Sequence, residues 1–144
     1  MTRINLIPPK LLLDQHLLAE HREIKRLPKN YSKYLSSKNK TKIPECYLFG
    51  TGHVTFFFNK GEFVFNRYRE LYLECLTRKF KVEDYSSSFT EEYLSSSFSF
   101  IPTELEIRLS INRIEDKFSL KPLWYKYYGK TIDFSYLSNL HKFL

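Results

Sequence analysis

The chain has 144 residues, a size typical of a single domain built around one hydrophobic core. Hydrophobic residues make up 42% of it and aromatic residues 17%, a composition that argues against intrinsic disorder. Its 23 Lys and Arg outnumber its 16 Asp and Glu, and the net charge of +7 favours an anionic partner: nucleic acid, an acidic protein or anionic lipid.

The first predicted helix covers residues 11–35. Apolar side chains recur there at spacings of three, four and seven residues, as on the buried face of an amphipathic helix: Leu13, Leu17, Ile24, Leu27 and Tyr31. Pro28 interrupts this pattern. Because proline has no N–H to donate to the carbonyl of Ile24, we expect a kink or a break rather than one straight helix.

Two further amphipathic helices follow. The second covers residues 62–79 and has an apolar stripe that runs from Val64 to Cys75. The third begins near Pro102, a residue suited to a first helical turn, and carries its core face from Ile107 to Phe118. These spacings predict two more helices that each bury one face.

The stretches between these helices read as irregular. Residues 50–58 indicate a turn followed by a short, extended, buried piece, and the serine-rich residues 85–100 indicate a long surface loop. The predicted fold class is therefore all-α, with a single compact domain of three helices joined by long loops over residues 1–144.

The first helix has a basic stripe on its solvent side. Gln15, Arg22, Arg26 and Lys33 project within roughly 40° of one another, opposite Leu17. Glu23 falls about 60° to one side of the stripe. The ordinary interpretation is a solvated helix face, and the alternative is a DNA-binding face. The carboxylate is the less ordinary part, because it is unfavourable beside DNA phosphates unless it takes part in chemistry.

A segment near the other end of the chain, residues 122–130, interleaves four aromatic residues with two lysines. Its aromatic rings could stack on bases while its lysines bind phosphates. They could equally pack onto the helices of a small domain. We expect both, with Trp124 in the core and some of the tyrosines exposed.

The remaining composition gives no sign of a cofactor or a membrane. His16 and His21 stand five residues apart, on different helix faces, and only four glycines are present, so neither a metal site nor a phosphate loop is indicated. No window approaches the ~20 apolar residues of a membrane span. Cys46 and Cys75 are interpreted as reduced, structural thiols, which predicts an intracellular protein.

The N-terminus is itself a candidate nucleophile. Removal of Met1 before a residue as small as Thr2 leaves a free α-amine with a pKa of roughly 7.7 to 8.0, so about one in seven is neutral at pH 7. A lysine amine, with a pKa of ~10.4, is neutral far less often. The Thr2 amine could thus form an imine without a special pocket. The same start is common in proteins that make no use of it.

Four ordered blocks resemble the phage pyrimidine-dimer DNA glycosylase family, the dimer-specific endonuclease V. They are Met1-Thr2-Arg3-Ile4-Asn5-Leu6, residues 14–23, Gly52-His53-Val54-Thr55-Phe56-Phe57 and Trp124-Tyr125-Lys126-Tyr127-Tyr128-Gly129-Lys130. The similarity spans about residues 1–132, so residues 131–144 form a C-terminal extension beyond the family's usual end.

The resemblance implies a DNA-repair enzyme with two activities and no cofactor. The first is a glycosylase that cuts the N-glycosidic bond of the 5′ pyrimidine in an ultraviolet-induced cyclobutane dimer. The second is a lyase that nicks the strand at the abasic site by β-elimination, through an imine (Schiff base) with the N-terminal amine. Its partner would be double-stranded DNA that contains pyrimidine dimers or abasic sites, bound by a monomer, with an undamaged base opposite the dimer extruded.

The resemblance also assigns residues. Thr2 would supply the attacking amine, and Glu23 would stabilise positive charge on the sugar and assist proton transfer. The predicted DNA contacts are Arg3, Gln15, Arg22, Arg26, Arg113, Lys117, Tyr125, Lys126, Tyr127 and Lys130. The family also implies a virus- or phage-encoded protein that works in the cytoplasm or in another DNA-containing compartment.

Two alternatives stay open. The first is a DNA-binding module on the same scaffold that has lost its chemistry, which requires Thr2 or Glu23 to be displaced or Met1 to be retained. The second is a glycosylase or lyase that acts mainly on abasic sites or other lesions. A helix-hairpin-helix glycosylase is disfavoured, because no glycine-rich hairpin precedes a lysine and aspartate pair.

Overall fold

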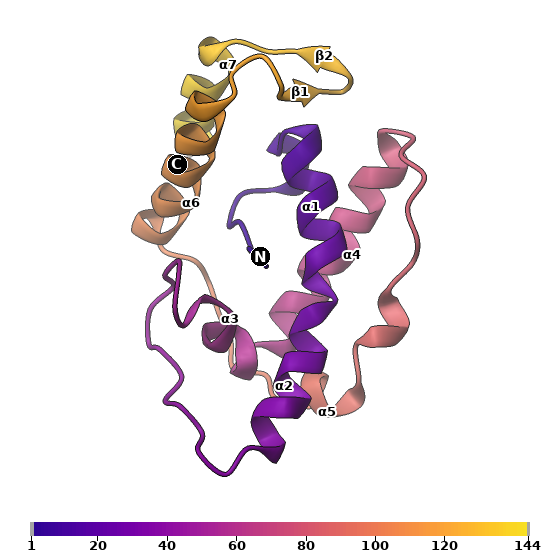
Figure 1. The fold of residues 1–144 in the computed structure, drawn as a ribbon, viewed down its shortest axis with the longest axis vertical. Coiled ribbons are helices and arrows are strands. Elements are labelled where there is room, and N and C mark those ends of the chain that lie inside the picture. Colours follow the sequence, from indigo (N-terminus) through magenta and orange to yellow (C-terminus); the bar gives the residue numbers. More distant parts are fainter. Residues whose placement is uncertain (1, 144) are drawn as a thin grey trace.

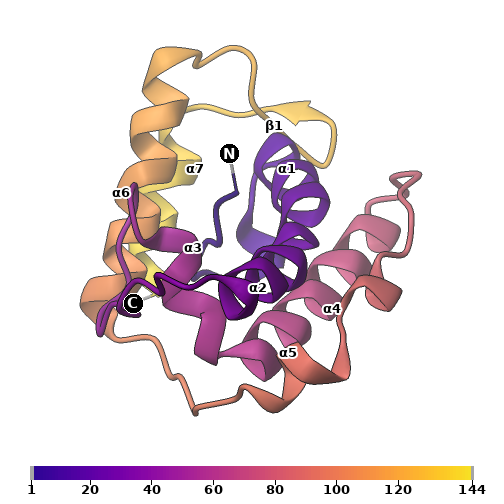
Figure 2. The ribbon, with the colours of Figure 1, turned by 60° about the horizontal axis from the view of Figure 1, so that its bottom comes forward.

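The computed structural model describes residues 2–143 and is almost entirely helical (Figure 1). Helices α1 (Asp14–Ile24) and α2 (Arg26–Ser36) follow one another as a bent rod, and α4 (Gly61–Thr77) packs beside α1. Helix α6 (Glu104–Leu120) stands on the other side of the molecule. Residues 2–8, which we call the N-terminal arm, run between α6 and α1 (Figures 1 and 2).

Short elements complete the fold. They are the helices α3 (His53–Phe56), α5 (Glu91–Ser95) and α7 (Phe134–Ser138), and the 3-10 turns Pro9–Leu11, Phe57–Asn59, Ser86–Ser88 and Asn139–Phe143. Strands β1 (Lys126–Tyr127) and β2 (Lys130–Thr131) pair as an antiparallel hairpin beside α1. Its two turn residues, Tyr128 and Gly129, both have positive φ, as a tight hairpin turn requires.

The break predicted in the first helix is present, but it lies before Pro28. Helix α1 ends at Ile24, α2 begins at Arg26, and Lys25 joins them. Pro28 is therefore the third residue of α2, a position where a helix has no internal partner for an N–H. The break lies N-terminal to Pro28 because the proline then falls in the first turn of α2, where the absence of a backbone N–H costs little.

The N-terminal arm is part of the core rather than a frayed end. Ile4 and Ile7 are almost completely buried, as are Leu17 of α1, Tyr68 of α4 and Ile111 of α6. The three long elements α1, α4 and α6 thus enclose an extended segment that fills the space between them. Thr2, at the start of the described chain, is only 6% exposed. The fold therefore fixes the backbone of the arm that leads to Thr2, the predicted nucleophile.

The all-α class is confirmed, whereas the expectation of three helices with irregular connections is incomplete. Residues 50–52 form a turn as predicted, but residues 53–59 are helical rather than extended: Gly52 (φ 95°) immediately precedes α3, and Phe56 and Phe57 are buried. A short apolar run does not reveal its own periodicity, so sequence could not separate a buried strand from a buried helical turn. The expected loop at 85–100 contains α5, whose Tyr93 is fully buried.

Helix α6 begins with a capping box, in which Thr103 and Glu106 exchange side-chain and backbone hydrogen bonds. The C-terminal extension packs on this helix and buries Leu137 and Leu140.

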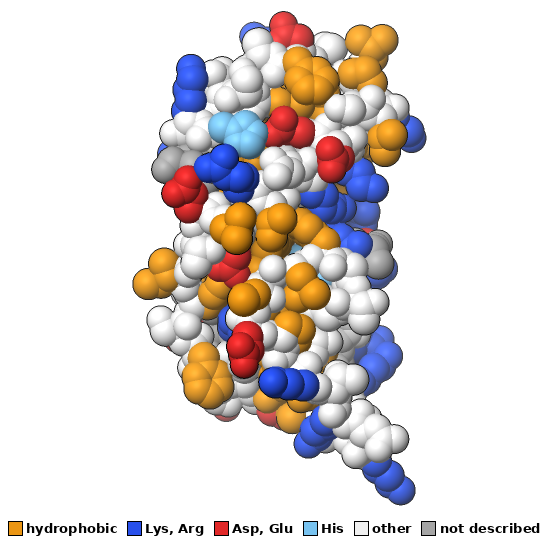
Figure 3. Space-filling view, turned by 90° about the vertical axis from the view of Figure 1, so that its left-hand side faces the viewer, with side chains coloured by type: hydrophobic (Ala, Val, Ile, Leu, Met, Phe, Trp, Pro, Cys, Tyr) orange, Lys and Arg blue, Asp and Glu red, His pale blue; other side chains and the backbone are white. Residues whose placement is uncertain are grey.

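The outward face of this side of the molecule mixes apolar, acidic and basic side chains, and most of the Lys and Arg visible there lie toward one edge (Figure 3). On this face the Lys and Arg side chains are thus unevenly distributed.

Among residues 2–143, no helix has both the length and the apolar character needed to cross a membrane. Cys46 is exposed and Cys75 is buried, and both are free thiols. Within the same described range, no group of three or more His, Cys, Asp or Glu side chains has an arrangement that could hold a metal ion.

Candidate active site

The N-terminal arm is held by hydrogen bonds from the elements around it. The backbone N–H of Ile4 donates to His53 Nε2 (2.9 Å), and the Ile4 carbonyl accepts from the Tyr47 hydroxyl (2.6 Å). The N–H of Leu6 donates to the Ser110 hydroxyl of α6 (3.0 Å). The Arg3 guanidinium donates to the carbonyl of Thr2 (3.0 Å). Buried backbone groups of an extended segment need such partners, since no strand lies beside it in the described chain.

A buried ion pair between α1 and α4 holds the next part of the arm. Arg67 Nε and Nη2 donate to Glu20 Oε2 and Oε1 (2.7 and 3.1 Å), and Arg67 also donates to the carbonyl of Ile7. Glu20 Oε1 accepts from the backbone and side-chain amides of Asn5 (3.2 and 2.8 Å). Each charge of this pair is thus satisfied by hydrogen bonds, the condition under which a buried pair is tolerated.

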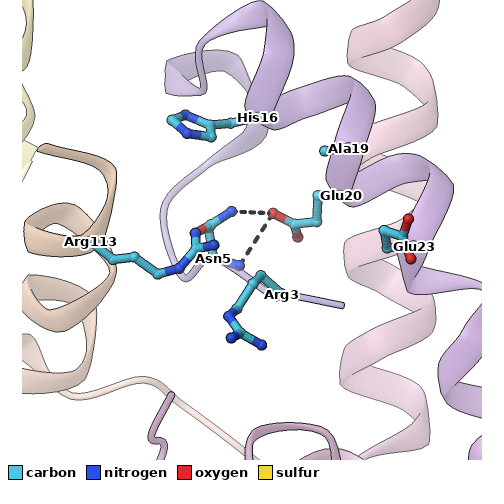
Figure 4. Close-up of a pocket in the computed structure, with 7 residues that line it drawn as sticks. All are labelled: Arg3, Asn5, His16, Ala19, Glu20, Glu23 and Arg113. Carbon is cyan, nitrogen blue, oxygen red and sulfur yellow. Dashed lines mark hydrogen bonds between the residues drawn. The ribbon is translucent and has the colours of Figure 1, made fainter. Parts of the chain in front are cut away.

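A cavity of about 70 Å³ opens between the arm, α1 and α6 (Figure 4). Its lining combines cations, carboxylates and an imidazole with one small apolar residue: Arg3, Asn5, His16, Ala19, Glu20, Glu23 and Arg113. The volume is enough for roughly two water molecules or for part of a sugar–phosphate unit. Arg113 reaches in from α6 on one side, α1 carries Glu23 on the other, and Arg3 of the arm lies between them (Figure 4).

Glu23, in the last turn of α1, is a buried carboxylate that pairs with two largely exposed arginines. It is 8% exposed, and its oxygens lie 3.3 Å from Arg22 Nε and 2.6 Å from Arg26 Nη1. The contact from Arg26 is an ion pair without hydrogen-bond alignment, so Oε2 has no hydrogen-bond partner in the described chain. Both arginine side chains remain more than half exposed. Each carboxylate oxygen thus lies beside one guanidinium, and Oε2 makes its contact as an ion pair alone.

His16 is a residue of this cavity that the sequence motifs did not single out. Both of its ring nitrogens are buried without a hydrogen-bond partner in the described chain. Burial, and then the nearby Arg113 and Lys117, lower its pKa to about 4, so the ring is neutral at pH 7. A spacing of seven residues, two helical turns, places it on the same face of α1 as Glu23. That spacing is the one signal in the sequence that could have revealed it, since His16 has no metal-ligand spacing.

The residues predicted to contact DNA differ in their surroundings. Arg22, Arg26, Lys117, Lys126 and Lys130 are exposed, and Arg3 and Arg113 line the cavity. The Gln15 side chain binds the chain itself, donating to the carbonyl of Trp124 (2.8 Å) and accepting from the N–H of Lys126 (3.0 Å). Tyr127 is half-buried, and its hydroxyl donates to the Lys10 carbonyl. These last two positions connect the β-hairpin to the start of α1.

The expectation that Trp124 is a core residue was wrong. Trp124 is 54% exposed, whereas Tyr125 is only 6% exposed and packs on His16 and Phe118. Neighbouring residues outside a helix often point in different directions, and aromatic character alone does not decide which one points inward. Tyr125 therefore supports a wall of the cavity through His16.

The fold and the cavity together describe a small, basic, all-helical protein with a carboxylate and several arginines beside its N-terminal arm. The arginines of that combination suit an anionic substrate, such as one that carries phosphates. A family model described as pyrimidine dimer DNA glycosylase matches residues 1–86. The chain belongs to this family, which confirms the resemblance noted in the sequence, and the family's substrate is DNA. The matched residues include the arm, α1 and α4, but α6 and the β-hairpin lie beyond them.

Proposed function

We propose that this protein excises pyrimidine dimers with the α-amine of Thr2 as nucleophile and then nicks the strand by β-elimination. The observation that carries the proposal is the buried Glu23 carboxylate, which lines the same cavity as Arg3, the residue next to Thr2. Met1 lies outside the described residues, and the proposal requires its removal. Thr2 and Glu23 are the catalytic residues of this scheme.

In the first step the neutral amine of Thr2 attacks C1′ of the 5′ nucleotide of the dimer. The C1′–N1 bond breaks, its electron pair stays with the pyrimidine, and the pyrimidine takes up a proton. Positive charge develops at C1′ and O4′ as this bond breaks, and the Glu23 carboxylate stabilises it at short range inside a site that is largely shielded from water. Glu23 also accepts a proton from the attacking nitrogen.

In the second step the C1′–O4′ bond opens, O4′ takes a proton, and a protonated imine joins Thr2 to C1′. The imine acidifies the hydrogens at C2′. Removal of one of them forms a C2′–C3′ double bond and expels the 3′ phosphate, which breaks the strand. Water then hydrolyses the imine and regenerates the amine. No cofactor is required at any point, since every proton and electron pair moves between the amine, Glu23, the pyrimidine, the sugar, the 3′ phosphate and water.

Binding to the damaged duplex is assigned to the cations that surround the cavity. Arg22 and Arg26 extend outward from Glu23, and Arg3 and Arg113 line its walls. Pyrimidine dimers distort and soften the duplex, so recognition rests on deformability and phosphate contacts more than on base sequence. Extrusion of the undamaged base opposite the dimer would give the cations access to the sugar.

Removing one of the outward arginines should weaken DNA binding and its salt dependence together. For Arg22→Ala or Arg26→Ala, the slope of log K against log salt should fall by about one unit, because one fewer phosphate is neutralised. Filter binding or fluorescence anisotropy across a salt series measures it. Arg108→Ala, at an exposed position paired with Glu104 on α6, serves as the control. An unchanged salt dependence for both variants would show that the basic stripe is a solvated helix face that does not contact DNA.

Borohydride trapping on a duplex with one defined cyclobutane dimer tests the proposed chemistry. Borohydride reduces the imine to a stable amine, so a covalent protein–DNA adduct should form with protein whose Thr2 amine is free. N-terminal acetylation, or retention of Met1, should remove the adduct. Persistence of the adduct with a blocked terminus contradicts the role of Thr2.

The same experiment separates the two alternatives. An adduct with abasic DNA but not with dimer DNA indicates a lyase that prefers abasic sites, and no adduct with either DNA indicates a binding module.

We further propose that residues 1–144 act as one monomeric domain inside a DNA-containing compartment. The burial of Leu137 and Leu140 against the rest of the core supports the inclusion of residues 131–144 in that domain.

A further inference from the structure

The block of residues 52–57 contributes nothing to the lining of the cavity, although it belongs to the matched part of the chain. Its role is visible in His53, the first residue of α3, whose side chain is almost fully buried. Gly52 precedes it at φ 95°, a conformation that favours glycine, and a Cβ there would lie 3.2 Å from Pro44. The turn at Gly50 and Gly52 thus directs the imidazole inward, toward the N-terminal arm.

Both nitrogens of this imidazole are engaged, and together they fix its tautomer. Nδ1 lies 2.6 Å from the carbonyl of Leu48, so it must carry the hydrogen and donate. Nε2 is then the acceptor, and it receives the N–H of Ile4 at 2.9 Å. Phe49 stacks on the same ring at 5.2 Å between centroids and blocks its rotation. The imidazole is therefore a fixed acceptor aimed at the arm.

The other side of the Ile4 residue is held from the same segment. The Tyr47 hydroxyl donates to the Ile4 carbonyl (2.6 Å) and lies 2.9 Å from the Ser110 hydroxyl, which in turn accepts from the N–H of Leu6. Burial raises the pKa of Tyr47, so the hydroxyl keeps its proton and remains a donor. His53 and Tyr47 together hold both polar groups of Ile4, and we call this arrangement the Ile4 clamp.

The clamp lies two residues from the proposed nucleophile. With Ile4 fixed, the position of the Thr2 amine depends on the backbone angles of Thr2 and Arg3 alone, a span of about 7 Å. Arg3 limits these angles further, because its guanidinium donates to the Thr2 carbonyl and lies 6.0 Å over the Phe49 ring. A displacement of about 1 Å at a reacting atom can cost about 100-fold in rate.

The charged groups around His53 favour its neutral form. Arg3 from the arm and Arg113 from α6 both act on it, and the other neighbours are the aromatic rings of Tyr47, Phe49 and Phe57. Burial, followed by these two arginines, lowers the pKa of His53 to about 4. The imidazole therefore stays neutral, and an acceptor, throughout the pH range in which the Thr2 amine could react.

We propose that His53 is a positioning residue for the imine-forming reaction: through the N–H of Ile4, and with Tyr47, it sets where the Thr2 amine stands relative to Glu23. This inference rests on the proposed function, since it assumes that the amine is the nucleophile. His53 itself does not touch the reacting atoms, and its loss should leave the affinity for DNA unchanged.

The test compares His53→Leu, which has no acceptor, with His53→Gln, whose amide oxygen can accept from Ile4. The measurement is the single-turnover rate of borohydride-trapped adduct on saturating abasic-site DNA, together with the DNA dissociation constant. His53→Leu should slow trapping about 10- to 100-fold with the dissociation constant within about twofold, whereas His53→Gln should stay within about fivefold of the unaltered protein. Tyr47→Phe, which removes only one hydrogen bond to the arm, should slow trapping several-fold.

His21→Leu is the matched control, because His21 is also a buried histidine but packs among Tyr68, Tyr72 and Tyr85, away from the arm. It should lower the melting temperature without slowing trapping. Unaltered trapping by His53→Leu overturns the inference, as does an equal loss in His53→Gln and His53→Leu. If His53→Leu fails to fold, unaltered trapping by Tyr47→Phe overturns it and slowed trapping supports it. Absence of an adduct with the unaltered protein would instead contradict the proposed function.

Discussion

Glu23→Gln should abolish cleavage of the base–sugar bond while leaving binding to dimer-containing DNA nearly intact. The glutamine keeps the size of the side chain but loses the negative charge that stabilises the sugar and the oxygen that accepts a proton. Removing a charge-stabilising or proton-transferring group from an enzyme typically costs about 10²- to 10⁴-fold in rate. Single-turnover cleavage of the base–sugar bond, measured as alkali-labile sites, gives the rate, and anisotropy gives the affinity.

The exposed Glu104 provides the control for this substitution. It pairs with Arg108 on α6, and both side chains are about half exposed or more. Glu104→Gln should therefore leave cleavage of the base–sugar bond unchanged. Turnover by Glu23→Gln at the unaltered rate removes Glu23 from the catalytic step. An equal loss of binding and turnover would make it a residue that shapes the DNA-binding surface.

Arg67→Met should cause a large loss of stability. The substitution leaves the Glu20 carboxylate buried without its cation and the Ile7 carbonyl without its donor. Breaking a buried pair in this way costs about 3–5 kcal/mol, which corresponds to a fall in melting temperature of about 10–15 °C for a domain of this size. Thermal unfolding followed by circular dichroism measures the shift.

The same substitution in an exposed pair isolates the effect of burial. Arg108→Met removes the cation of a solvent-exposed ion pair, and such pairs contribute about 0–1 kcal/mol. Its melting temperature should therefore stay within about 3 °C of the unaltered protein. Equal shifts for Arg67→Met and Arg108→Met would show that the Glu20–Arg67 pair does not hold the arm in the core.

Helices with a strong apolar stripe could be predicted from the sequence, and the positions of buried charges could not. Periodicity located α1, α4 and α6, because each buries one face. Glu20 and Arg67 look like surface residues in a linear sequence. They are buried because the arm between the helices needs hydrogen bonds that only long polar side chains can supply.

The candidate site could be predicted only in part, because local sequence patterns do not show which distant segments meet. Glu23 stood out as an acid beside a basic stripe, and the structure places it in a cavity with Arg3. His16 and Asn5 were not predicted, since their importance depends on the arm crossing α1, a contact between segments distant in sequence. The pairing of His53 with Ile4 spans 49 residues, so no local pattern could reveal it. Proline and glycine positions indicated turns, but they did not tell which side chains those turns direct inward.

Peptide mapping of the borohydride-trapped adduct tests the central claim most directly. The reduced protein–DNA adduct, digested and analysed by mass spectrometry, should carry the sugar remnant on the α-nitrogen of Thr2, in a peptide from which Met1 is missing. A remnant on a lysine side chain, or on a peptide that still begins with Met1, would contradict the assignment of the Thr2 amine as the nucleophile.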